Sequence, residues 1–596
     1  MRIKKNQMKH SKLVLTILST FLVTSCSEDF LDYKPKGTVS GEQLTTAETV
    51  DGLVTAAYAM MGNDFWTRAH SHMWFWGSVR AEDSFKGGGS VADQYPYHRL
   101  EVHSLITTDE SRWDWNWQEI FDGIHRANEA LRKLNSLEES WDLLEQRKAE
   151  ARFVRGHFYF VAKRIFKRLP WIDETVEFAN IKTVGNQELS DQELWDKIAA
   201  DFQFGVDNLP AVQAQVGRVN KHAATAYLAK TKLYQAYEQD ASHNVTNVNT
   251  GKLAEVISLC DVIINSGAFA LHDDFGKNFV PEHESGVESV FSIRYSIEDG
   301  TTNGRIQMAT SLNYNMLGPY GCCDFHNPSY SMLSAFETKD GLPLFEGYND
   351  EILYEADTWA ALESLDGIDM GPTGPTVDPR LDHSIALPTH PFKYDPTFLM
   401  TKGGRRVPEI YGYLSSLKEA EHHENPAFKK IGPFFGTSRD LDIIRDDDIL
   451  LMKAEALIQT GNHADALPLI NQIRARAAES TDWLIHSDGS AVANYNISEY
   501  EDGVNCTWTP DFALKALQWE RFIEFAFEGH RFFDLVRWGV AAETINAYFE
   551  RENQMFAHLN DAQFTKGRHE YVPIPQNQIN LTEGAYIQNT GYYTGG

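Results

Sequence analysis

Apolar side chains recur at three- and four-residue steps along much of this chain, and that spacing constrains the fold more than any other feature. Steps of this size place the side chains on one face of an α-helix. The stretch from Trp117 to Leu134 shows the pattern, and a second stretch, from about 142 to 168, ends at Leu169-Pro170, because proline stops a helix. Further amphipathic stretches cover about 191–208, 219–238 and 252–266. The spacing predicts a mainly α-helical protein.

A second helical signal lies near the C-terminus, in the segment ILLMKAEALIQTGNHADALPLINQIRARA. Its small and apolar residues fall at the offsets of a tetratricopeptide helix pair; they are Ala454, Leu457, Gly461, Ala466 and Ile470. Alanines let the paired helices approach closely, and the glycine forms the tight turn between them. A generic helical hairpin is the alternative, since alanine and leucine are common in helices.

The helical pattern weakens between the two ends of the chain, where glycine and proline cluster and short strand-like pieces such as Val290–Ile297 occur. We therefore divide the body into a helical region at 47–270, a loop-rich insertion at 271–440 and a second helical region with its tail at 441–596. Loops held by a rigid frame are where binding residues tend to lie. The insertion and the early loops of the first region are thus the places to search for a ligand site.

The first residues have the pattern of a secretory signal peptide. Five basic residues precede an apolar run from Leu13 to Val23, which is shorter than the 20 or so residues of a membrane span. The run ends in small residues before Cys26, a pattern that resembles a lipobox, in which the cysteine is acylated. We expect a signal peptide at 1–25, lipidation of Cys26 and a tether at 26–46, with an ordinary cleavage site as the alternative. Acyl chains would hold the protein at a membrane without a spanning helix.

The charge balance narrows the class of partner. The whole chain has a formal net charge of -30, and loss of the signal's five basic residues leaves -35. Nucleic acids and anionic lipid heads require clustered Lys and Arg, so neither is expected as a partner. The charge does not exclude glycans, peptides or proteins as partners.

Motifs for cofactors, metals and catalysis are missing from the sequence. It holds no HExxH, GxSxG, phosphate loop or dinucleotide glycine pattern, and no cysteine spacing typical of zinc. We expect no cofactor and no metal, and interpret His422-His423 as solvated. The cysteines beyond Cys26 are expected to be buried structural thiols, although sequence does not determine the redox state of the adjacent pair Cys322-Cys323.

Several segments together resemble the SusD/RagB family of surface nutrient-binding lipoproteins. The segment SCSEDFLDYKPKG is similar to the family's start, EARFVRGHFYFVAKRIFKRLP to its arginine-aromatic helix, and VPIPQNQI to its closing segment. The most specific match is ERFIEFAFEGHRFFDLVRWG at 520–539, and DDDILLMKAEALIQTGNHADALPLINQIRARA is similar to the late helix pair. The matches occur in the family's order over nearly the whole chain.

The resemblance implies a tetratricopeptide-like superhelix of about four helix pairs with a large, loop-rich ligand-binding region. It implies a non-catalytic protein at the cell surface that captures oligosaccharides or polysaccharides. It also implies a SusC-like TonB-dependent transporter as partner and an outer-membrane location through the lipid anchor. Glu28 and Asp29 are similar to the family's surface-export signal.

Sugars present apolar ring faces and many hydroxyls, so their sites combine exposed aromatic platforms with oriented polar groups. Three aromatic segments fit: residues 64–90, SRWDWNWQEIF, and the stretch around 303–331. The family places binding groups in the first and often a stacking aromatic in the last. The candidate ligand-binding residues are Trp74, Trp76, Arg80, Asp83, Trp113, Arg305, Tyr314 and Tyr320. The alternative for the tryptophans is the core, where large aromatics usually lie.

The alternatives to glycan capture are catalysis, peptide capture and protein binding. Glu524 and Glu528 could suggest a glycoside hydrolase or lyase, which uses two carboxylic acids. Four-residue spacing is common on helices, however, and both acids would need a cation such as Arg521 or Arg531 nearby. A peptide-capturing member of the same family and a protein-binding scaffold are the remaining alternatives.

Overall fold

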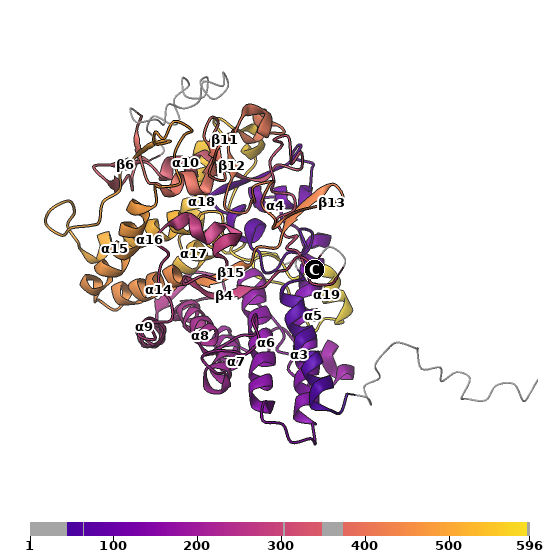
Figure 1. Ribbon diagram of the computed structural model, residues 1–596. Helices are drawn as coiled ribbons and strands as arrows, with labels where there is room; N and C mark the ends of the chain where they lie inside the picture. Colours follow the sequence, from indigo (N-terminus) through magenta and orange to yellow (C-terminus); the bar gives the residue numbers. More distant parts are fainter. Residues whose placement is uncertain (1–43, 64, 302–303, 349–373, 593–596) are drawn as a thin grey trace, which may run out of the picture.

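The computed structural model describes residues 44–63, 65–301, 304–348 and 374–592 (Figure 1). The expected signal peptide, Cys26 and most of the expected tether lie outside these residues. Among the helices of the described ranges, none is long and apolar enough to cross a bilayer.

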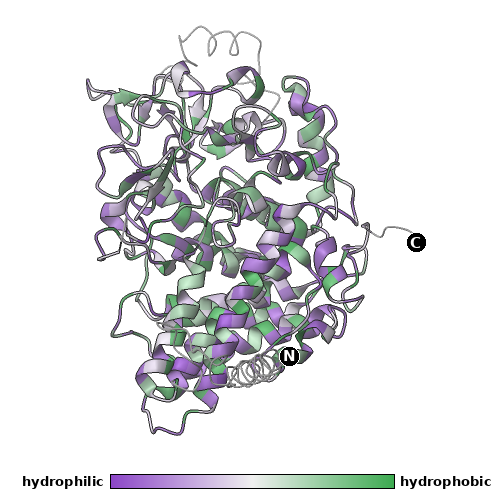
Figure 2. Ribbon diagram, turned by 90° about the vertical axis from the view of Figure 1, so that its right-hand side faces the viewer, coloured by the Kyte–Doolittle hydropathy of each residue, from purple (hydrophilic) through white to green (hydrophobic). Residues whose placement is uncertain are grey.

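Helices of the N-terminal half form a continuous array. The long ones are α3 (Ala47–Met61), α5 (Ser111–Asn135), α6 (Leu144–Phe166), α7 (Asp191–Asn208), α8 (Lys221–Ala236) and α9 (Thr250–Ile264). From α5 to α9 each packs against the next, while α3 covers α5 and α6 (Figure 1). Each predicted helix exists, and the ends differ by a few residues except at the start of α5. Figure 2 shows hydrophobic and hydrophilic residues alternating along these ribbons, as the apolar spacing predicts.

The array continues into the C-terminal half, where α14 packs against α9. The helices there are α14 (Asp446–Gln459), α15 (His463–Glu479), α16 (Pro510–Glu524), α17 (Arg531–Trp538), α18 (Ala541–Glu552) and α19 (Gln576–Leu581). Gly461 has φ +86° in the turn between α14 and α15, a conformation that glycine adopts without a Cβ penalty. The expected tetratricopeptide-like, mainly α-helical fold is confirmed.

Strands in the described residues occur as two-stranded pairs. Antiparallel β4 (Ser289–Ile293) and β15 (Leu441–Arg445) pack against α8 and join the two halves of the chain. The other antiparallel pairs are β1 (Ser84–Gly87) with β5 (Phe325–Pro328), β2 (Tyr237–Gln239) with β3 (Val245–Val248), β6 (Thr338–Lys339) with β7 (Leu342–Pro343), β9 (Ile385–Ala386) with β12 (Ser415–Ser416), β10 (Pro391–Phe392) with β11 (Asp395–Leu399), and β13 (Phe428–Ile431) with β14 (Phe434–Thr437). The pair of β8 (Thr376–Val377) and β16 (Asn494–Tyr495) is parallel.

Short helical pieces connect these pairs. They are η2 (Trp74–Ser78), α4 (Tyr95–Val102), η3 (Phe178–Thr183), η4 (Phe275–Phe279), η5 (Pro281–His283), α10 (Tyr330–Ala335), α12 (Arg380–Ser384), η7 (Lys402–Gly404), α13 (Pro408–Tyr411) and η8 (Ala557–Leu559). The strand pairs and short helices of the middle region form the upper part of the molecule in Figure 1, opposite the ends of α3, α5 and α6.

The 520–539 motif lies in a buried ion-pair network. Arg380 Nη1 lies 2.6 Å from both Glu520 Oε1 and Glu524 Oε2, and Arg476 also pairs with Glu524. The cations beside Glu528 are Arg445 and Lys418. The carboxylates therefore have the cations they need, but these come from other elements and not from the motif's own arginines.

The arginines of the motif point to other carboxylates. Arg521 pairs with Asp448 and Asp534. Arg531 pairs with Glu82, which belongs to the segment at 65–90 that we call the early loop. Arg531 thus pairs with a carboxylate that is distant in the sequence, whereas Asp534 contacts Arg537, three residues away, at 2.9 Å. Because every one of these charges is paired inside the fold, the motif is structural, and it holds helices and loops that are distant in the sequence.

Three buried carboxylates, those of Glu288, Asp447 and Glu524, have oxygens within 4.8 Å of one another. Arg476 contacts Glu288 at 3.0 Å and Arg445 contacts Asp447 at 2.6 Å. Burial raises the pKa of Asp447 well above its usual value. Each of the three carboxylates is thus contacted by at least one buried guanidinium group.

Gly529 brings the motif against the early loop. A Cβ on Gly77 would lie 1.9 Å from the Gly529 carbonyl oxygen, and Gly529 itself has φ +75°. Its backbone N–H donates to Ser78 Oγ at 3.2 Å. Both glycines therefore permit close packing of the motif against this segment, and Gly529 also takes the positive φ between α16 and α17.

Candidate functional site

Three candidate tryptophans lie in the core. Trp74, Trp76 and Trp113 are each 0 % exposed. Each indole N–H donates to a backbone carbonyl: Trp74 to Ala309 at 3.0 Å, Trp76 to Ala69 at 3.2 Å and Trp113 to Thr107 at 3.1 Å. With the ring faces covered and the polar atom satisfied, these side chains offer no platform to a sugar, and the core alternative holds.

The position of Trp113 follows from where its helix begins. A helix that began near Asp114 would leave Trp113 in the preceding loop, but α5 begins at Ser111. Residues four apart share a helical face, so Trp113 and Trp117 both turn inward. Trp115, two residues away, turns to the opposite side and is partly exposed.

Arg80 and Asp83 are also buried. The Arg80 guanidinium lies 3.7 Å over the Phe532 ring and donates to the His569 carbonyl at 2.6 Å. Burial lowers the pKa of Arg80 to about 9 and raises that of Asp83 to about 6. Asp83 accepts a backbone hydrogen bond from Phe527 at 3.3 Å. Both side chains tie the early loop to the C-terminal motif, so neither is available to a ligand in this conformation.

The three candidates from the aromatic stretch around 303–331 divide between the core and the surface. Tyr314 and Tyr320 pack in an aromatic cluster with Phe435 and are 1 % and 3 % exposed. Arg305 is exposed and lines a cavity of about 510 Å³ together with Arg218 and Arg294. Among the eight candidates Arg305 alone is solvent-accessible, and its role in binding stays a prediction.

Other aromatic side chains do reach the surface together. We call them the aromatic face: Phe65, Trp66, Tyr95, Trp115 and Phe434. Phe65 and Tyr95 are 40 % and 39 % exposed, and the other three are partly buried. The ring of Trp66 lies 5.6 Å from that of Phe65 and 6.0 Å from that of Phe434.

A single arginine links the two tryptophans of the aromatic face. The Arg112 guanidinium lies 5.2 Å over Trp66 and 4.9 Å over Trp115. It donates from Nη2 to Gln94 Oε1 at 2.7 Å, beside Tyr95. Arg68 also lies over Trp115, at 5.7 Å from the ring centroid. Cationic and amide groups thus stand between aromatic rings, the combination that a sugar site requires.

Four elements hold the aromatic face. The loop after α3 carries Phe65 and Trp66, and its backbone pairs with Met308. Tyr95 begins α4, Trp115 lies in the first turns of α5, and Phe434 begins β14. Figure 1 shows the β13–β14 hairpin beside α4 and the upper end of α5. The rigid scaffold therefore brings together segments that are more than 300 residues apart in sequence.

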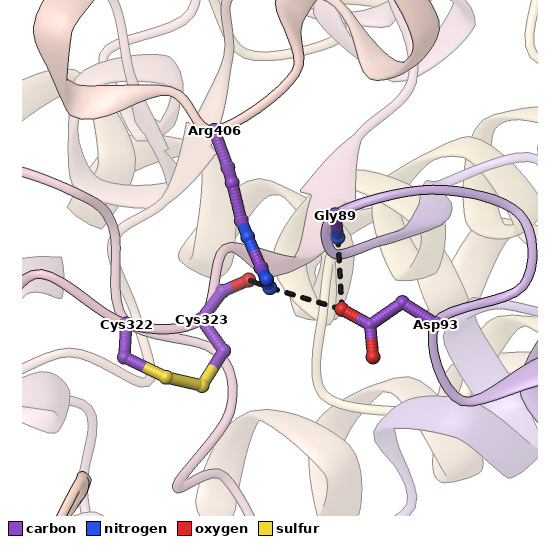
Figure 3. Close-up of a disulfide and its surroundings, with 5 residues drawn as sticks. All are labelled: Gly89, Asp93, Cys322, Cys323 and Arg406. Atoms are coloured by element: carbon purple, nitrogen blue, oxygen red, sulfur yellow. Dashed lines mark hydrogen bonds and ion pairs between the residues drawn. A yellow bond between two sulfur atoms is a disulfide. The ribbon is translucent and has the colours of Figure 1, made fainter.

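A disulfide lies beside the loop that leads into Tyr95. Cys322 and Cys323 are bonded to each other, which corrects the expectation of structural thiols at this pair, whereas Cys260 and Cys506 are free. Arg406 connects the pair to the loop, because its Nη1 contacts the Cys323 carbonyl at 3.4 Å and Asp93 at 2.9 Å (Figure 3).

Asp93 also organises the glycine-rich loop before it. Its carboxylate accepts from the Gly89 N–H at 2.9 Å (Figure 3). Lys86 Nζ donates to the Asp93 carbonyl at 2.6 Å. The side chains of Asp93 and Arg406 keep exposures of 27 % and 40 %. This pair adds a carboxylate and a guanidinium at the edge of the aromatic face, one residue from Gln94.

The sequence contained a partial signal for the aromatic face. Trp66 and Trp115 stand in the two tryptophan-rich segments, but composition does not say which ring of a cluster faces solvent. Phe434 could not be found in this way, because its neighbour Phe435 is equally apolar and 0 % exposed. Successive side chains of β14 point to opposite faces, so the register of the strand decides which of the two rings faces solvent. The sequence alone does not give that register.

Comparison with known proteins agrees with the fold. Residues 287–592 match the model of the SusD family, and residues 29–233 match a SusD-like model described as starch-binding and associating with the outer membrane. The chain belongs to the SusD family. SusD-like protein P38 of Formosa agariphila is 25 % identical over 541 residues, which cover 89 % of this chain and 92 % of the relative.

Solved SusD structures show the same architecture. A SusD homolog from Bacteroides thetaiotaomicron superimposes with a TM-score of 0.67 at 20 % identity, covering 94 % of this chain and 100 % of that one. Surface glycan-binding protein A from the same organism, in complex with laminarihexaose, gives a TM-score of 0.61 at 19 % identity, with coverage of 91 % and 100 %. At these identities the likeness establishes the fold.

Proposed function

We propose that this SusD-family protein captures oligosaccharides or polysaccharides on the aromatic face and does no covalent chemistry on them. The observation that carries the proposal is that Arg112 lies over Trp66 and Trp115 and donates to Gln94, while Trp66 also contacts Phe65 and Phe434. Aromatic rings stack on the apolar faces of pyranose rings, while the guanidinium and amide donate to and accept from hydroxyls. The laminarihexaose complex of a protein with this fold supports the ligand class.

The charges of the described residues support binding rather than hydrolysis. Glu524 and Glu528, the carboxylates that suggested an enzyme, are paired with buried arginines and lysine and lie away from the aromatic face. Near the aromatic face, Asp93, Glu119 and Glu110 are each paired with an arginine, and Asp114 accepts from Gln118, Asn577 and Gln578. A glycosidase requires two free carboxyl groups on either side of one bond.

The proposal also includes delivery of the captured glycan into the cell. We infer a lipid anchor at Cys26, an outer-membrane location facing the cell surface, and transfer of the captured glycan to a SusC-like TonB-dependent transporter. The family relationship and the SusD-like model's description of outer-membrane association support this part. A binding protein without catalytic machinery needs such a partner for its ligand to enter the cell.

Calorimetric titration of the body from Ser27 onward tests the ligand class. The panel contains laminarihexaose, other neutral hexasaccharides, acidic hexasaccharides and extended peptides, with product analysis after each titration. Saccharide binding without cleavage supports the proposal, and Trp66→Ala should weaken it by about tenfold or more. Trp519→Ala is the matched control, because Trp519 is a partly buried tryptophan on α16 that contacts Tyr348.

The other outcomes separate the alternatives. Binding of peptides alone would keep the family and replace the ligand class. Cleaved saccharide would make the protein an enzyme. Saccharide binding that Trp66→Ala and Trp115→Ala leave unchanged would move the site away from the aromatic face.

A further inference from the structure

A second surface cavity lies in the loop-rich region, and it shares no lining residue with the aromatic face. Its volume is about 670 Å³, within the 300–1,000 Å³ or so of small-molecule sites. We call it the Trp483 groove. Its walls are the β10–β11 hairpin, the turn after α15, the η5 segment and the loop at 421–426.

Aromatic side chains form one wall of the Trp483 groove. The Trp483 ring lies 4.9 Å from that of Tyr394 and 6.3 Å from that of His283, with which it stacks at an interplanar angle of 28°. All three side chains are partly exposed. Unlike Trp74 and Trp113, Trp483 therefore keeps part of its indole at the surface of a cavity.

The wall is fixed in place from behind. His383 Nε2 lies 2.9 Å from the Ser480 carbonyl, to which it donates, so its Nδ1 accepts from the Tyr394 hydroxyl at 3.0 Å. Ser480 also accepts, at Oγ, from the Phe275 N–H at 2.8 Å. The Tyr394 ring is thus held by a chain of buried hydrogen bonds before any ligand arrives.

The backbone that presents Tyr394 is unusual. Lys393 and Tyr394 form the two-residue turn between β10 and β11, with φ +49° and φ +65°. Turns of this kind favour Asn and Gly, because a bulky side chain at positive φ is strained. The strain places the tyrosine on the groove and lets Lys393 Nζ donate to the Phe279 carbonyl at 2.9 Å.

Carboxylates surround the aromatic wall. The groove is lined by Glu282, Asp395, Glu421, Glu424 and Asp482. Asp395 lies 3.3 Å from His422, and Glu282 accepts from Asn425 at 2.8 Å, so both are oriented with acceptor capacity left over. Lys393, His283 and His422 are the basic lining residues, and Glu421 is paired with Arg439, so the groove keeps an excess of acidic side chains.

We propose that the Trp483 groove is a second saccharide-binding site, specific for sugar units that carry no acidic group. The indole and tyrosine rings stack on the sugar, and the carboxylates accept hydrogen bonds from its hydroxyls or from an amine. Uronic acids and sulfated sugars are repelled by the surrounding negative charge. The proposal takes its ligand class from the proposed function but stands on a separate cavity.

Ring contacts place one aromatic cluster between the two sites. Phe398 of β11 contacts His422 of the groove and Tyr320 of the core cluster. Phe435 belongs to that cluster, and its neighbour Phe434 belongs to the aromatic face. A rigid block therefore separates the groove from the aromatic face, so the two sites can be observed independently.

Fluorine NMR of the body labelled with 5-fluorotryptophan tests the two sites separately. The chain has 14 tryptophans, and the signals of Trp483 and Trp66 are assigned from Trp483→Phe and Trp66→Phe. The probes are laminarihexaose, a hexamer of glucosamine and a hexamer of galacturonic acid. We expect saturable shifts of the Trp483 signal with the first or second probe and none with the third.

The variants decide between the outcomes. In Trp66→Ala the Trp483 response should persist, and Tyr394→Ala should weaken it by about tenfold. The inference is overturned if neither laminarihexaose nor the glucosamine hexamer moves the Trp483 signal, if only the acidic hexamer does, or if Trp66→Ala abolishes the response. If a saccharide shifts the Trp66 signal but not the Trp483 signal, the proposed function stands and the second site is refuted. If it shifts only the Trp483 signal, the groove binds saccharide and the aromatic face does not.

Discussion

Replacing Arg380 by methionine should destabilise the fold without any change to the aromatic face. The Arg380 side chain is 0 % exposed, and Nη1 reaches Glu520 and Glu524 at 2.6 Å. Nε and Nη2 reach Asp378 at 3.0 and 2.7 Å. Methionine has a similar length but leaves these carboxylates short of one positive charge inside the protein.

The size of the effect follows from this burial. Removing one partner of a buried ion pair costs about 3–5 kcal/mol, because the remaining charge has no compensation. An unfolding entropy of about 2 cal/mol/K per residue gives roughly 1 kcal/mol/K for a chain of this size. The melting temperature should therefore fall by about 3–5 °C. Differential scanning calorimetry of the body from Ser27 onward measures the shift.

The pH dependence provides a second test of the same network. Burial alone would raise the pKa of Glu524, but Arg476 and Arg380 outweigh it and hold the pKa at about 2. A carboxyl with a lowered folded pKa stabilises the protein above its unfolded pKa of about 4.3, and the contribution is lost as pH falls toward the folded value. Loss of Arg380 raises this pKa, so the variant's deficit should be largest at pH 7 and narrower at pH 4.

An exposed pair is the control for the Arg380 variant. Lys182 lies 3.3 Å from Glu583, with side-chain exposures of 62 % and 79 %, so Lys182→Met should shift the melting temperature by less than about 1 °C. A similarly small shift for Arg380→Met at pH 7, or a deficit that widens on acidification, would refute the assignment of the 520–539 motif to a buried ionic core.

Three further outcomes are expected. Trp115→Ala should weaken saccharide binding by about tenfold with little change in melting temperature, whereas Trp113→Ala should lower the melting temperature by about 3 °C or more, as calorimetry of both variants will show. Gly77→Ala should lower stability by at least about 1–3 kcal/mol in denaturant titrations, since its Cβ would meet the Gly529 carbonyl. Thiol titration of the denatured, unreduced body should count two free groups, those of Cys260 and Cys506, and four after reduction; four before reduction would contradict the disulfide.

Local patterns in the sequence were sufficient for the helices. The spacing that predicted a helix at 191–208 depends on residues within one or two turns, and α7 spans the same residues. Gly461 likewise marks a turn through its own backbone. The start of α5 was the exception, because Ser111 begins a helix before its first apolar residue.

The site depended on contacts that the sequence does not encode locally. The candidate role of Trp113 depended on a helix start near Asp114, whereas α5 begins at Ser111 and turns Trp113 into the core. The partner of Glu524 is Arg380, which lies 144 residues away, so no spacing rule within the motif could find it. The bond between Cys322 and Cys323 was equally invisible, since an adjacent pair reads the same in either redox state.

The structure of the body with a bound oligosaccharide, obtained with the tightest ligand from the calorimetric panel, would show whether the aromatic face is the capture site. We expect an intact glycan with sugar rings within about 4 Å of Trp66 and Trp115 and a hydroxyl on Arg112 or Gln94. A glycan bound elsewhere with the aromatic face empty, or a cleaved product at any site, would contradict it.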